Sequence, residues 1–151
     1  MAAQIWKFYN RAKFSIGAGV IDLNTTTFDM HLFISASDFA TGTQSTLGEL
    51  SGEVASGNGY TRSGKPMTVT WTQGASASEF RFDMTAQIWT GTGGSIANIK
   101  AAVIVARTGA SGKATANKLL AYASLSSGQF TVTIGNTLTL STPANGIFEL
   151  N

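Results

Sequence analysis

The sequence has 151 residues, none of them cysteine, and only one of them is histidine. Without cysteine, neither a disulfide framework nor a thiolate metal site can support the fold. A zinc site built from several histidines is also excluded, because His31 has no second imidazole to join it. We therefore expect no metal ion and no cofactor, and the hydrophobic core must stabilise the chain unaided.

Charge is also scarce, since only 12% of the residues are charged. That is about half the usual share in a soluble domain. Ten basic and eight acidic residues leave a net charge of +2. The basic residues are scattered, and the closest group, Lys7, Arg11 and Lys13, suits a solvated helix face better than a nucleic-acid surface. We predict no nucleic-acid partner and a surface with little charge repulsion, which an assembled protein tolerates.

Long hydrophobic runs are missing as well. No segment of the sequence reaches the roughly 20 apolar residues that span a bilayer. In the first thirteen residues the basic side chains follow the apolar ones, which is unlike a secretory signal. We therefore predict no membrane association, and folding in a reducing cytoplasm.

Apolar residues, at 43% of the chain, recur with two different periods. From Ile5 to Ile16 their spacing predicts a helix that Gly17 and Gly19 end, although Trp6 and Phe14 also fit a strand. Farther along, alternation at every second residue predicts about eight strands separated by Gly-, Ser- and Asn-rich turns. The expected strands cover residues 28–34, 67–72, 80–85, 101–106, 119–125, 130–134, 138–140 and 147–150, and Ile88 with Trp89 could extend the third of them to 80–89.

This pattern predicts an all-β fold, an antiparallel β-sandwich with one short N-terminal helix, and a jelly roll is one form that it could take. We expect a single domain over residues 1–151, with a helical arm at 1–17 and a β core at 18–151, because each half alone would be too small for a good core. Residues 101–106 are apolar at every position and should form a central strand. Residues 48–65 contain five glycines and should form a long exposed loop.

Catalytic motifs are incomplete. A Ser-His-Asp triad would depend on His31, and the sequence has no G-x-S-x-G elbow. Residues 109–113 resemble a phosphate-binding loop, but Arg107 stands where its first glycine should be. Asp29 and Asp83 could form a carboxylate pair, yet their positions suit solvated strand faces equally well. We predict no enzymatic activity and no catalytic residues.

Several short segments follow one another in a distinctive order. After FYNRAKFSIGAG in the N-terminal helix come IDLNTTTFDMHL at residues 21–32, EVASGNGYTRSG at 53–64 and GIFEL at 146–150. This order is similar to that in a family of small structural proteins of tailed bacteriophages, and the resemblance covers most of the chain. It implies a virion component that is made in the cytoplasm of a host bacterium.

With this resemblance, the expected function is capsid decoration. Copies of the protein would bind the major capsid protein on the capsid exterior, as a trimer at local threefold positions, and cement the head. One alternative is a tail or neck component that binds tail proteins. Another is a carbohydrate- or receptor-binding β-sandwich module that uses exposed Trp and Tyr residues.

Contacts with partners are expected in two regions, the N-terminal segment through Phe14 and the loop at residues 49–65. Large aromatic side chains dominate the energetics of protein interfaces, so they weigh most in this choice. The candidate interface residues are Trp6, Phe8, Tyr9, Phe14, Glu53, Tyr60, Arg62, Lys65 and Trp89.

Overall fold

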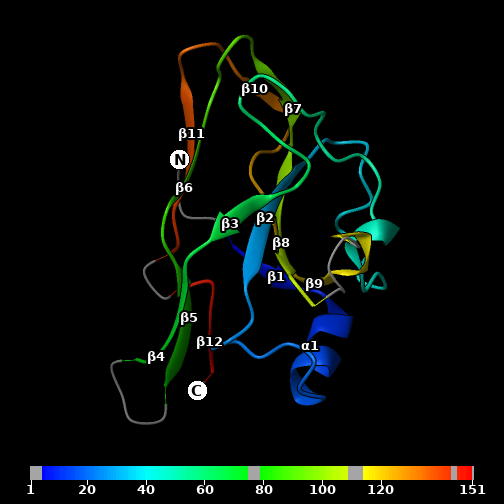
Figure 1. The fold of residues 1–151 in the computed structure, drawn as a ribbon, viewed down its shortest axis with the longest axis vertical. Coiled ribbons are helices and arrows are strands. Elements are labelled where there is room, and N and C mark those ends of the chain that lie inside the picture. Colours follow the sequence, from blue (N-terminus) through cyan, green and yellow to red (C-terminus); the bar gives the residue numbers. More distant parts are fainter. Residues whose placement is uncertain (1–4, 75–78, 109–113, 144–145, 151) are drawn as a thin grey trace.

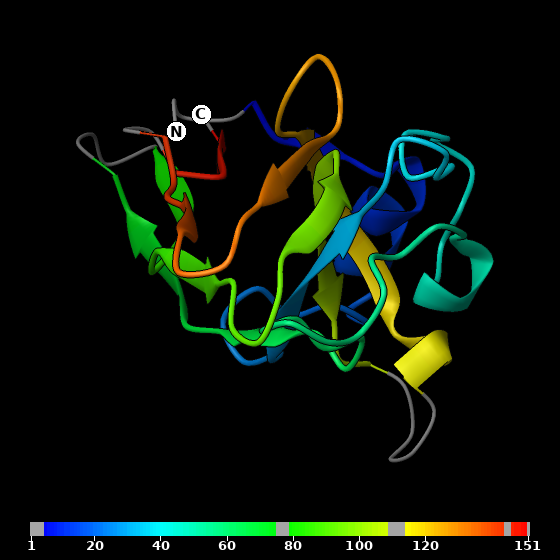
Figure 2. The ribbon, with the colours of Figure 1, turned by 90° about the horizontal axis from the view of Figure 1, so that it is seen from above.

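A computed structural model describes residues 5–74, 79–108, 114–143 and 146–150, and it shows two layers of antiparallel strands with one short helix (Figure 1). The all-β prediction with one N-terminal helix is confirmed. Seen from above, the green and red strands of one layer lie beside the blue, yellow-green and yellow strands of the other (Figure 2).

The first layer is a five-stranded sheet with the order β1-β9-β8-β2-β3. Strand β8 is central and buried at all six positions, as its run of Ala, Val and Ile predicts. A separate two-stranded pair, β10 with β7, adjoins this sheet because β7 runs almost directly into β8. The strands are β1 (Lys7–Phe8), β2 (Phe28–Phe33), β3 (Lys65–Met67), β7 (Ile96–Ile99), β8 (Ala101–Ala106), β9 (Lys118–Ser124) and β10 (Phe130–Val132).

The second layer contains a three-stranded sheet, β12-β5-β4, and the pair β11 with β6. Aromatic rings join it to the first layer: Phe28 of β2 meets Phe82 of β5 with ring centroids 5.3 Å apart, and Phe8 of β1 meets Phe148 at 4.4 Å. These contacts across the layers define the sandwich. The strands are β4 (Val69–Gln73), β5 (Phe80–Met84), β6 (Gln87–Thr90), β11 (Thr137–Leu140) and β12 (Phe148–Leu150).

The helix is shorter than predicted. Helix α1 spans Asn10–Gly17, whereas Lys7 and Phe8 form β1 and pair with Tyr122 and Ala121 of β9. Pairing satisfies the backbone of these two residues at the sheet edge, and the Phe8 ring gains a partner in the other layer. These long-range contacts outweigh the local helical spacing.

The alternation of apolar and polar residues in strand β2 predicts one exposed face, which is wrong, because the strand is buried at all six positions. The reason lies in the segment predicted to be an exposed loop, which packs along β2. Its Val54 N–H donates to the Leu32 carbonyl (2.9 Å), and the Tyr60 side chain is fully buried. A short 3₁₀ helix, η1 (Leu47–Glu49), begins this segment. Only part of residues 48–65 is therefore exposed.

Two further boundaries differ from the sequence prediction. Residues 80–89 form two strands, because β5 pairs within the three-stranded sheet while β6 pairs with β11. Strand β7 was not predicted, because its sequence, Ile-Ala-Asn-Ile, does not alternate between apolar and polar residues. A second 3₁₀ helix, η2 (Ala114–Ala116), precedes β9.

Candidate functional site

One cluster of polar side chains is an ion pair between Asp29 and Arg107 on the outer face of β2. Asp29 is only 2% exposed, and its carboxylate accepts hydrogen bonds from Nε and Nη2 of Arg107, the latter at 2.6 Å. These bonds raise the pKa of the guanidinium above its usual value. The interpretation of Asp29 as a solvated strand-face residue is wrong, because the carboxylate is buried and paired.

The geometry also separates the two aspartates considered as a catalytic pair. Phe28 and Phe82 face each other between the layers, so strand alternation turns the next residues, Asp29 and Asp83, to opposite outer faces of the sandwich. Asp83 instead accepts a hydrogen bond from the backbone N–H of Met84 (2.7 Å). The two carboxyl groups therefore cannot flank one substrate.

The second polar group surrounds the single histidine. His31 Nδ1 lies 2.8 Å from Glu53 Oε1, which also accepts a hydrogen bond from the Tyr60 hydroxyl (2.7 Å). The Tyr60 oxygen in turn accepts a bond from the Leu32 N–H (3.0 Å). Burial raises the pKa of the Tyr60 phenol, so it stays a neutral donor. Gly64 closes over the other imidazole nitrogen, where an added Cβ would collide.

These hydrogen bonds hold residues 53–60 against β2. Replacing Tyr60 with phenylalanine should lower the free energy of unfolding by about 1–3 kcal/mol, because the Leu32 N–H and the Glu53 carboxylate each lose a partner. Urea unfolding of both proteins measures the difference. Tyr122→Phe is the matched control, since Tyr122 is partly buried but its hydroxyl makes no hydrogen bond with the residues that the structure describes. Equal losses in the two variants would contradict a role for the Tyr60 hydroxyl.

Within the described ranges, no group of three or more His, Asp and Glu side chains could hold a metal ion. No described helix is both long and apolar enough to cross a membrane. Residues 109–113, which resemble a phosphate-binding loop, lie outside the part of the chain that the structure describes.

The candidate interface residues divide by burial. Four of the nine are buried within the chain and cannot offer a binding surface, which corrects the prediction for Trp6, Tyr9, Tyr60 and Trp89. Their large apolar rings fill the core, which is where such rings bury the most surface. Three others are partly buried: Phe8, Glu53 and Lys65. The remaining two, Phe14 and Arg62, are exposed.

The exposed arginine and the partly buried lysine are engaged by the chain itself. Arg62 donates through Nη2 to the Glu53 carbonyl (2.9 Å) and through Nε to the Val54 carbonyl (3.2 Å). Lys65 donates to the Ile88 carbonyl (2.5 Å) and lies over the Trp89 ring. Phe14 is therefore the one large apolar residue of the predicted set that faces solvent, at 69% exposure.

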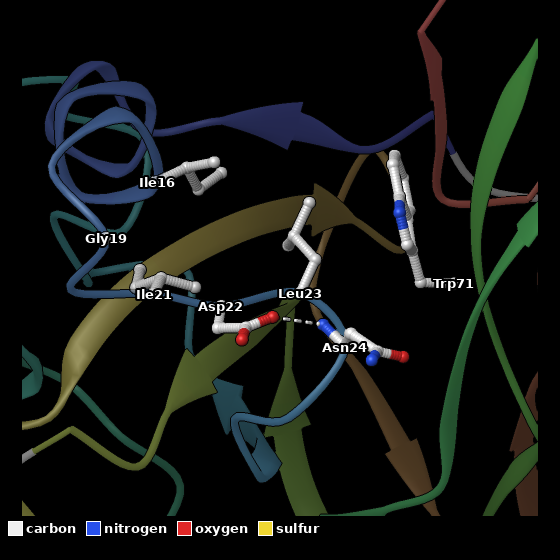
Figure 3. A pocket seen from close by; sticks show the side chains of 7 residues that line it. All are labelled: Ile16, Gly19, Ile21, Asp22, Leu23, Asn24 and Trp71. Atoms are coloured by element: carbon white, nitrogen blue, oxygen red, sulfur yellow. Dashed lines mark hydrogen bonds between the residues drawn. The ribbon is translucent and has the colours of Figure 1, made fainter.

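A groove that the sequence analysis missed lies at one end of the sandwich (Figure 3). Its volume is about 400 Å³, and Trp71 of β4 stands across it from Leu23. Trp71 is partly exposed, and its ring stacks on Phe80 with an interplanar angle of 19°. The lining residues are Ile16, Gly19, Ile21, Asp22, Leu23, Asn24 and Trp71.

The pattern of the sequence does not predict this groove. Trp71 alternates with threonines like any half-buried strand residue, and nothing local shows that β4 is an edge strand. The one local indication in the sequence is Asp22, whose carboxylate begins a tight turn by accepting hydrogen bonds from the N–H groups of Asn24 and Thr25.

Comparisons with protein-family models, curated proteins and solved structures found no match for this chain.

Proposed function

We propose that the protein is a non-enzymatic structural component of a tailed-bacteriophage particle, and that it decorates the capsid exterior by binding the major capsid protein. The observation that carries the proposal is an exposed apolar surface on the N-terminal helix, where Phe14 faces solvent. The order of sequence segments described above supplies the phage context.

The helix surface has the composition of a protein contact. Phe14 shares a helix face with Arg11 three residues earlier, and exposed Lys13 lies next to it in the sequence. Val20, just beyond the helix, adds a second exposed apolar side chain. An aromatic anchor with a cationic rim suits a partner that has an apolar pocket bordered by acidic residues.

The buried polar groups support a non-enzymatic role. Asp29 is paired with Arg107, and His31 and Tyr60 share Glu53, so the polar side chains that are buried on β2 or over it stabilise the fold. Decoration needs only differential binding: a protein that binds the assembled lattice and not free subunits stabilises that lattice by mass action. Several copies joined together, as a trimer would be, bind more tightly through multivalency.

The copy number in purified virions tests this proposal. Quantitative mass spectrometry should find the protein in an amount comparable with that of the major capsid protein. A few copies per particle would contradict decoration and favour the tail or neck, which the same apolar surface would also serve. Complete absence from intact particles would contradict both roles. Sedimentation of the isolated protein tests the expected trimer.

A substitution on the helix tests the contact surface directly. Phe14→Asp should weaken binding to decoration-free capsids about 30-fold or more, as expected for the loss of a hot spot worth about 2 kcal/mol. Circular dichroism should remain unchanged, because the side chain is solvated. Ile134→Asp is the matched control, since Ile134 is 62% exposed and lies in the connection between β10 and β11. The assigned surface is wrong if Ile134→Asp weakens binding and Phe14→Asp does not.

A further inference from the structure

We propose that the groove between the α1–β2 loop and Trp71 binds a neutral pyranose sugar, which stacks on the indole and accepts and donates hydrogen bonds at Asn24 and Asp22. This inference is independent of the virion role, because its argument uses Trp71, Asp22 and Asn24, and the proposed capsid contact uses none of them. It places sugar recognition on Trp71, because the other two tryptophans, Trp6 and Trp89, are buried.

The indole supplies the apolar side of the site. One side of the Trp71 ring is occupied by its stack on Phe80, with centroids 5.9 Å apart, and the ring also contacts Phe148 at 5.9 Å. These contacts fix the orientation of the ring before any ligand arrives. In Figure 3 the ring is seen edge-on, with the Leu23 side chain standing between it and Ile16. Aromatic faces are electron-rich, so they attract the C–H bonds on the apolar side of a pyranose ring.

The Asp22 turn supplies a fixed acceptor. Its carboxylate accepts bonds from Asn24 N (2.8 Å), Thr25 N (3.3 Å) and Thr25 Oγ1 (2.7 Å), and these bonds, led by that of the Thr25 hydroxyl, hold its pKa below the usual value. A carboxylate offers roughly four acceptor positions, so about one remains for a ligand hydroxyl. Because the turn already fixes the group, little ordering is needed when a ligand binds.

Asn24 supplies both a donor and an acceptor. It is exposed at the rim of the groove, and its side-chain amide makes no hydrogen bond within the described ranges. An amide beside a carboxylate can bind two adjacent hydroxyl groups of a sugar, donating to one oxygen and accepting from the next. Few other small ligands present vicinal hydroxyl groups above an apolar face.

The size and charge of the groove narrow the ligand class. A volume of about 400 Å³ lies within the range of small-molecule sites and accommodates one or two sugar rings. The lining contains one anion, Asp22, and no cation, which disfavours phosphorylated and acidic ligands. Gly19 has no side chain, and a Cβ placed on it would meet open space, so the groove is open to solvent beside this residue.

The test uses the whole protein and free sugars as probes. Saturation-transfer NMR with the methyl pyranosides of glucose, galactose, mannose and N-acetylglucosamine should detect binding of at least one of them. Asn24→Ala should weaken that binding at least tenfold and leave the fold intact, because the amide holds nothing in the free protein. Thr137→Ala, on an exposed face of β11, is the control that should bind normally.

Trp71→Ala provides the second arm and should abolish binding. Because this change also removes packing against Phe80 and Phe148, its folding is checked by circular dichroism and the conclusion rests on Asn24→Ala. The proposal is overturned if no pyranoside binds the wild-type protein, or if binding survives in Asn24→Ala at full strength. Binding of the unmodified protein to acidic glycans alone would overturn the predicted preference for neutral sugars.

Discussion

Replacing Arg107 with methionine should lower the free energy of unfolding by about 3 kcal/mol, because the Asp29 carboxylate would then be buried without a partner. The carboxylate is only 3% exposed, and both Nε and Nη2 of Arg107 donate to it. We expect the lower end of the usual range of about 3–5 kcal/mol, since Arg107 itself is 45% exposed and water can partly replace it. Urea unfolding at neutral pH measures the loss.

Two further variants show whether the effect belongs to the pair. Arg11→Met removes an exposed charge that has no ion pair within the described ranges, and it should leave stability almost unchanged. The double variant Asp29→Leu with Arg107→Met should recover most of the lost stability, because no charge is then left buried. If Arg107→Met behaves like Arg11→Met, the ion pair contributes little and the burial of Asp29 must be relieved in another way.

The strands were predictable where burial on one side imposes a period of two. In β5 the alternation of Phe80, Phe82 and Met84 with polar residues reports directly which face meets the other layer, and the continuous apolar run of β8 reports burial on both faces. The helix boundary was not predictable, since Lys7 and Phe8 take their conformation from β9, more than one hundred residues away in the sequence. Local spacing contains no information about such a partner.

The candidate site was less predictable than the fold for the same reason. Asp29 and His31 look solvated in an alternating strand, and only the return of residues 53–60 and of Arg107 over β2 buries and pairs them. Trp71 looks like an ordinary strand residue until the turn at Asp22 is placed across from it. In each case the property depends on which distant segment covers a side chain.

Phe82→Ala should destabilise the protein by about 3–5 kcal/mol, because it removes a fully buried ring and leaves a cavity where the two layers meet. Phe82 contacts Phe28 of the first layer at 5.3 Å and Phe148 of its own layer at 5.2 Å between ring centroids. No single neighbour can move to fill the space without losing its other contacts, so collapse of the cavity should be limited. Urea unfolding measures the loss.

Phe80→Ala is the matched control, since Phe80 lies two residues earlier on the same face of β5 but is 41% exposed. Its loss should cost about 1 kcal/mol, because part of the ring is already hydrated and water can enter the space. The ratio of the two losses tests whether the layers are held together at the Phe28–Phe82–Phe148 cluster rather than along the whole strand. Similar losses would contradict a special role for this buried cluster in joining the two layers.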